Sequence, residues 1–127
     1  MEWRGKIYRI LLWDIGGQDK SPNMGNIFAR DSLGCLIFSD CTKRETLEET
    51  LDWKKVINDV GVFPDEGKLP FVLVQNKIDL VQAEELEGDE EELKKFVDEN
   101  GFLTFTRTSC KNNQNVNETM DFLLANV

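Results

Sequence analysis

Runs of apolar residues alternate with amphipathic segments along the chain. Two runs dominated by apolar residues come early, at residues 7–13 (IYRILLW) and 32–39 (SLGCLIFS), and a third, FVLV, occupies residues 71–74. Apolar runs of this length without regular polar alternation are typical of strands buried on both faces. We therefore expect strands over these three runs, and a fourth over residues 102–105.

Three other segments carry apolar residues at helical spacing. Thr42 and Glu45 match the capping pattern of a helix start, and the apolar positions that follow predict a helix over residues 42–61. Acidic residues open a second helical pattern at residues 89–101. The third pattern, at residues 116–127, repeats apolar positions at i, i+4, i+7, i+8 and i+11.

Buried strands that alternate with amphipathic helices indicate the α/β class. Such a chain builds a mostly parallel sheet with helices on both faces, which gives three layers. The length of 127 residues fits one domain over residues 1–127. Ligands of such sheets bind beyond the carboxyl ends of the strands, so the segments that follow each strand are the places to look for chemistry.

Composition excludes several classes of function. The net charge of −9 opposes a phosphate backbone, so we expect no nucleic-acid partner. The absence of histidine excludes Ser-His-Asp and Cys-His catalysis and all imidazole metal ligands. Three cysteines without a C-x-x-C motif predict free thiols, and no signal peptide or membrane-length apolar run is visible. We expect a cytoplasmic protein.

Polar motifs follow three of the four expected strands. They are DIGGQ at residues 14–18, NKID at residues 76–79 and TSCK at residues 108–111. An acid at a strand end can hold a magnesium ion through water, a glycine lets its N–H approach a phosphate, and a glutamine can orient a water molecule. Amide and carboxylate groups can read the edge of a guanine ring. Taken alone, the first and third motifs are better explained as turns, and the second is equally well explained as a polar turn.

In this order the motifs D-x-x-G-Q, N-K-x-D and [ST]-S-x-K resemble the guanine-nucleotide motifs of the Ras superfamily of small GTPases. Trp13 before the acid, together with NKIDL at residues 76–80, resembles the Rab branch more narrowly. The resemblance covers residues 7–127 and implies a G domain that binds GTP or GDP with Mg²⁺ and hydrolyses GTP as a switch in vesicle traffic. It also implies effector, exchange-factor and GTPase-activating proteins as partners.

The resemblance assigns the phosphate end of the site to the first motif. Asp14 would hold Mg²⁺ through water, Gly17 would donate its N–H to the γ-phosphate, and Gln18 would be the catalytic residue that positions the attacking water. Gly16 stands where the family usually has alanine, which adds backbone freedom at this point.

The resemblance assigns the base end to the other two motifs. Asn76 and Asp79 would read guanine, and Lys77 would cover the ribose and the ring. The base pocket would be closed by the last motif, through Ser109, Cys110 and Lys111. Cys110 stands where alanine is usual, so the pocket wall is bulkier here.

The printed sequence lacks the phosphate-binding loop G-x-x-x-x-G-K-[ST] that opens the family's domain. Residues 61–68 (GVFPDEGK) have one intervening residue too many, and Leu69 replaces the hydroxyl, so we interpret them as a surface loop. Loss of about five charge-assisted hydrogen bonds removes roughly 7–15 kcal/mol of phosphate binding. We therefore expect a domain truncated at both ends, impaired in nucleotide binding, with a gap in its sheet.

Two alternatives stay open beside the GTPase hypothesis. The chain can be a non-catalytic binding module, a pseudo-GTPase, or a fragment without a function of its own. No prenylated cysteine motif ends the sequence at Val127, so we expect no direct membrane anchor and membrane association only where a lipidated tail exists in the parent protein.

Overall fold

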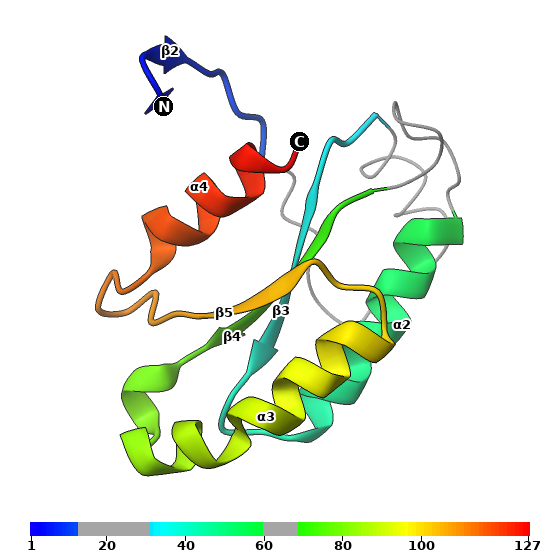
Figure 1. Cartoon of the computed structure of the whole chain (residues 1–127), viewed down its shortest axis with the longest axis vertical. Coiled ribbons are helices and arrows are strands. Elements are labelled where there is room, and N and C mark those ends of the chain that lie inside the picture. Colours follow the sequence, from blue (N-terminus) through cyan, green and yellow to red (C-terminus); the bar gives the residue numbers. More distant parts are fainter. Residues whose placement is uncertain (13–30, 60–68) are drawn as a thin grey trace.

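The structure, a computed structural model, describes residues 1–12, 31–59 and 69–127 (Figure 1). A short N-terminal hairpin precedes a domain of alternating strands and helices. In chain order the elements are β1 (Glu2–Trp3), β2 (Lys6–Ile7), β3 (Cys35–Asp40), α2 (Glu45–Asp59), β4 (Phe71–Asn76), the short 3₁₀ helix η1 (Ile78–Leu80), α3 (Ala83–Glu99), β5 (Thr104–Arg107) and α4 (Val116–Ala125).

A parallel sheet of order β3-β4-β5 forms the middle layer. Figure 1 shows α2 and α3 together on one side of this sheet and α4 on the other. The three-layer α/β class predicted from the sequence is therefore confirmed. The register pairs Asp40 with Asn76 and Gln75 with Arg107, so all three strands end at the same edge.

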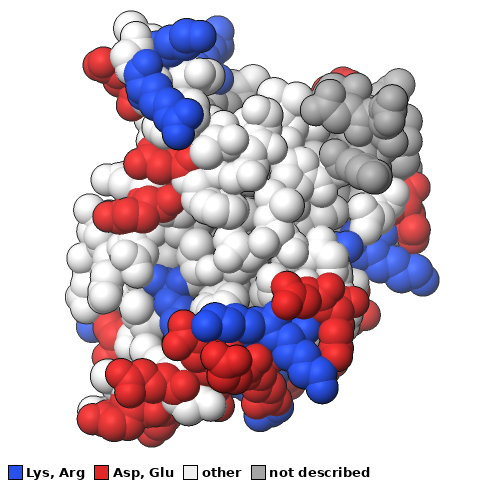
Figure 2. Space-filling view, in the orientation of Figure 1, with Lys and Arg blue, Asp and Glu red and all other residues white. Residues whose placement is uncertain are grey.

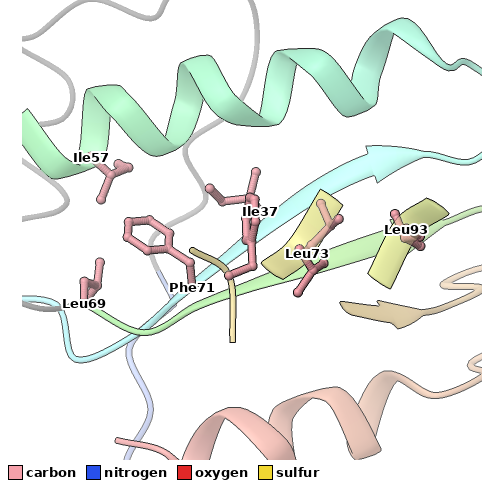
Figure 3. Close-up of a cluster of buried hydrophobic side chains, with 8 residues drawn as sticks. Ile37, Ile57, Leu69, Phe71, Leu73 and Leu93 are labelled. Carbon is pink, nitrogen blue, oxygen red and sulfur yellow. The ribbon is translucent and has the colours of Figure 1, made fainter. Parts of the chain in front are cut away.

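The core lies between the sheet and the pair α2 and α3. The central strand β4 is buried over four consecutive residues, 71–74, which explains why its sequence shows no polar alternation. Figure 3 shows Ile57 of α2 directed toward Phe71 of this strand. The other buried members of the cluster are Ile37, Leu69, Leu73, Leu93, Val97 and Phe102.

The strand predicted over residues 7–13 is wrong in its described part. Only Ile7 is in a strand, the two-residue β2, and it is 88% exposed, while residues 8–12 form no strand. Arg4 and Gly5 both have positive φ, as a two-residue hairpin turn requires, so the chain folds back on its own N-terminus. Trp3 packs edge to face on Tyr8 at 5.9 Å. The apolar composition of residues 7–12 indicated a buried strand. The hairpin turn and the contact between Trp3 and Tyr8 instead fold the start of this segment onto the N-terminus.

The helix predicted from residue 42 begins three residues later, at Glu45. Thr42 does not cap the helix in the predicted way, because its hydroxyl donates to Asp40 Oδ1 at 2.6 Å. The predicted end of this helix at Gly61 lies outside the described residues.

The helix predicted over residues 89–101 begins six residues earlier, since α3 starts at Ala83 and continues through Gly88. A glycine inside a helix costs about 1 kcal/mol, and the strong helix formers on both sides offset it. The helix predicted at residues 116–127 is confirmed by α4. The fourth strand is displaced by two residues, because Phe102 is buried in the core before β5 begins.

Charged side chains of both signs cover the outer helices. Figure 2 shows them close together over α2 and α3. On α3, Lys94 pairs with Glu90 and Glu91, and Lys95 pairs with Glu99, all as exposed contacts of 3.4–3.8 Å that each contribute about 0.3–0.5 kcal/mol. Among the helices in the described ranges, none combines the length and the apolar character needed to cross a bilayer.

Within the described residues, β3 is paired along one edge and open along the other. The N–H groups of Cys35 and Cys41 donate to the β4 side at 2.9 and 3.1 Å. Because N–H directions alternate along a strand, those of Leu36 and Phe38 point away from β4. The next outward N–H, of Asp40, is bonded to a threonine hydroxyl of α2. No strand within the described residues pairs with this edge.

An open edge of this kind recruits other chains. We predict that the wild-type chain self-associates and that Phe38→Pro weakens the association about tenfold, since it removes an outward N–H without breaking a bond to β4. Sedimentation velocity over a concentration series measures this. The control is Phe38→Ala, which also loses the half-exposed ring but keeps the N–H. A wild-type chain that stays monomeric at the highest concentration reached would contradict the prediction.

Candidate functional site

The ends of β4 and β5 are joined by backbone contacts that bring two of the predicted motifs together. Lys77, directly after β4, has left-handed dihedrals of φ 69° and ψ 31°, which turn the chain into η1. A lysine in this region costs about 1 kcal/mol, which the surrounding bonds must offset. The N–H of Ile78 donates to the carbonyl of Thr108 at 3.2 Å. The NKID and TSCK segments therefore form one surface.

Asn76 uses its side-chain oxygen within the protein. Its Oδ1 accepts from the hydroxyl of Thr108 and from the N–H of Cys110, both at 3.1 Å. These bonds fix the amide plane, because only one atom of the amide can accept. The amide Nδ2 donates to no group among the described residues, so its hydrogens stay available to a ligand.

Asp79 is fixed by a buried serine. The hydroxyl of Ser109, which is fully buried, donates to Asp79 Oδ1 at 2.8 Å and accepts from the N–H of Asn112 at 3.1 Å. This arrangement leaves Asp79 Oδ2 without a partner among the described residues. A carboxylate held in this way presents one oriented acceptor edge to a ligand.

A cavity of about 350 Å³ lies where these groups meet. Five of the six residues predicted for the base end line it, and the sixth, Ser109, donates a hydrogen bond to Asp79. The lining residues are Asn76, Lys77, Asp79, Leu80, Cys110 and Lys111. The sequence pattern did not single out Leu80, which adds an apolar wall. The N–H of Cys110 donates to Asn76 Oδ1.

Asp40, at the end of β3, belongs to the site although the sequence analysis passed over it. Its Oδ2 accepts from Lys77 Nζ at 2.8 Å, and its Oδ1 accepts from the N–H and the hydroxyl of Thr42 at 2.9 and 2.6 Å. The bonds from Lys77 and Thr42 lower the pKa of Asp40 from 3.8 to about 2, and the same ion pair raises the pKa of Lys77. The signal was an acid directly after a buried strand, the criterion that singled out Asp14.

The residues predicted for the phosphate end, Asp14, Gly16, Gly17 and Gln18, lie outside the described residues. In the ranges that the structure does describe, no group of three or more cysteine or acidic side chains is placed to hold a metal ion. All three cysteines lie within those ranges and are free thiols, as expected. Burial raises the pKa of Cys35 to about 12, which makes that thiol unreactive.

We predict that Ser109→Ala destabilises the fold by about 1–3 kcal/mol, because it removes a buried hydroxyl that bonds to Asp79 and to a backbone N–H. Urea unfolding followed by circular dichroism measures the change. The matched control is Ser39→Ala, since Ser39 is also buried but makes only a 3.5 Å bond to a carbonyl. Equal losses for the two variants would contradict the importance of the bond to Asp79.

We also predict that the free energy of unfolding falls at acid pH as Asp40 becomes protonated. The pKa of Asp40 is lower in the folded state than in the unfolded chain, so its contribution is complete above about pH 4 and is lost as the pH falls toward 2. Asp40→Asn should therefore be less stable than wild type at pH 7, and the two should converge near pH 2. Unfolding curves at stepped pH test this. A difference that persists unchanged at pH 2 would contradict it.

Comparison with known proteins places this geometry in a family. The family model described as the Ras family matches residues 1–127. The Ras-related protein Rab-7L1 of Homo sapiens is 33% identical over 125 residues, covering 98% of this chain and 60% of that protein. Rab-32 of Sus scrofa is 30% identical over 128 residues, covering 100% of this chain and 56% of that protein, so the chain spans little more than half of these relatives. The chain belongs to the Rab branch of the Ras superfamily of small GTPases.

Proposed function

We propose that these 127 residues carry the guanine-reading part of a Rab-like GTPase that acts as a switch in vesicle traffic. The observation that carries the proposal is Asp79. Its carboxylate is held by the buried Ser109 at the mouth of a cavity, which leaves Oδ2 and further acceptor capacity on Oδ1 for a ligand. Proteins of this family generally bind GTP or GDP with Mg²⁺, and regulators and effectors act on them.

The pocket offers the donors and acceptors that distinguish guanine from adenine. The edge of guanine carries an N–H and an adjacent amino group, which a single carboxylate can bind together. Adenine has no N–H at that ring position, so the Asp79 carboxylate would meet a lone pair. The Asn76 amide, fixed by Thr108 and Cys110, supplies an outward donor beside it. The arrangement therefore favours guanine.

For the phosphate end of the proposed site, the support comes from the sequence motif alone. Gln18 would orient the attacking water, Gly17 would donate to the γ-phosphate, and Asp14 would hold Mg²⁺ through water. The ion supplies charge neutralisation at the phosphates when bound. In this proposal the described residues recognise the base, and none of them takes part in the hydrolysis.

Affinity of the printed chain should be low, since it contains no G-x-x-x-x-G-K-[ST] segment. Two or three hydrogen bonds and contact with one face of the base amount to about 4–5 kcal/mol, which corresponds to a roughly millimolar Kd. Hydrolysis by these residues alone should not exceed the rate in water. In a longer protein with a phosphate-binding loop, the same pocket would contribute selectivity on top of phosphate affinity.

We predict that guanosine 5′-monophosphate binds with a millimolar Kd and that the adenosine analogue binds at least about tenfold more weakly. Asp79→Asn exchanges an acceptor for a donor, so it should lose the guanine ligand and favour xanthosine 5′-monophosphate, which has a carbonyl where guanine has its amino group. NMR titration, followed by the backbone amide shifts, measures the Kd of each of the three nucleotides.

The matched control is Asp98→Asn, the same substitution at an exposed position of α3 remote from the cavity. It should leave the preference unchanged. Equal affinity of the wild-type chain for guanine and adenine nucleotides would overturn the proposal.

A further inference from the structure

We propose that Asp40 is a positioning residue that holds the Lys77 side chain along the wall of the base cavity, ready to cover a guanine ring. The inference rests on the proposed function, because it deepens how the same site binds its ligand. It assigns a role in recognition to a residue of β3, a strand that contributes no lining residue to this cavity.

The Asp40 carboxylate is itself rigidly placed. Its backbone N–H donates to the hydroxyl of Thr46 at 2.9 Å, which ties the end of β3 to the first turn of α2. Both bonds from Thr42 reach the same carboxylate oxygen, Oδ1, and so direct the other oxygen toward Lys77. The Asp40 side chain is only 13% exposed. It is therefore a fixed anchor and not a mobile surface acid.

Lys77 is held at both of its ends. Its backbone is fixed in the left-handed region by the turn into η1, and its ammonium is bonded to Asp40 Oδ2 at 2.8 Å. The four-carbon stem between these ends lines the base cavity, and its side chain is 52% exposed. Without the anchor, little in the described surroundings would restrict this stem. The register that pairs Asp40 with Asn76 makes the reach short.

Anchoring matters because a free lysine loses rotamer freedom when it packs on a ligand. A lysine already fixed has lost that freedom before the ligand arrives, so more of the contact appears as affinity. Lys77 also lines a second cavity of about 270 Å³, and Asp40 lines that cavity too. The ion pair with Asp40 therefore lies on the β3 side of Lys77, beside the base cavity.

The test uses the full chain with guanosine 5′-monophosphate as the probe. Asp40→Asn keeps an acceptor for Thr42 but removes the charge that holds Lys77, and it should weaken binding roughly three- to tenfold. Lys77→Met should weaken it to a similar extent, and the double variant should lose no more than either single one. Asp40→Glu, which restores a carboxylate, should recover part of the affinity.

The mobility of the Lys77 side chain is measured directly, without ligand, from the NMR signals of its Cε and Nζ atoms. In the wild-type chain they should show a restrained side chain, and in Asp40→Asn they should match a free lysine. Arg44→Gln, which breaks an exposed ion pair with Glu92 near the start of α2, is the matched control and should change neither readout. Unfolding curves identify any variant that fails to fold.

The outcomes separate the two proposals. If wild type binds the guanine probe in preference to the adenine one but Asp40→Asn binds it equally well, the role of Asp40 is overturned and the guanine site stands. If the losses from Asp40→Asn and Lys77→Met add in the double variant, Asp40 acts independently of Lys77 and the inference is also overturned. If wild type shows no preference for guanine, the proposed function fails and the inference fails with it.

Discussion

The parallel register of the three central strands is the constraint on which the candidate site depends. It places the last residues of β3, β4 and β5 at one edge, so Asp40, Asn76 and the segment after Arg107 become neighbours although they are far apart in sequence. Both faces of β4 are buried over residues 71–74, and its two parallel ladders join it to β3 on one side and to β5 on the other. The central strand thus sets where the polar groups at the strand ends lie.

Polar contacts then refine what the sheet has brought together. Thr108 and Ser109 are small, buried and bonded to Asn76 and Asp79, so the two base-end side chains are oriented before any ligand is present. The left-handed backbone of Lys77 stores strain at the same turn. This combination of rigid support and local strain is common at binding sites, where a few groups must be presented in one orientation.

The sequence predicted the strands of the parallel sheet and α4, because continuous apolar residues and regular helical spacing are strong local signals. The residues predicted for the base end do lie together around one cavity, and their role in binding stays a prediction. It failed at residues 7–12, where apolar composition does not reveal that a two-residue turn reverses the chain. It placed the start of α3 too late, at the acidic residues from Asp89 onward, because strong helix formers on both sides carry the helix through Gly88. Asp40 could have been found as an acid directly after a buried strand, but its contact with Lys77 joins two strand ends and is not visible in either segment alone.

The central position of β4 also affects how the chain reaches its fold. Leu73 pairs with residues 36 positions earlier and 32 positions later in the sequence, so both parallel ladders are non-local. The hairpin β1-β2 joins residues a few positions apart and can form in about 1–10 μs. Parallel pairing must instead wait until long segments of chain, with their helices, have closed. The base cavity, which is lined from the ends of both β4 and β5, therefore cannot form before the ladder between these two strands has closed.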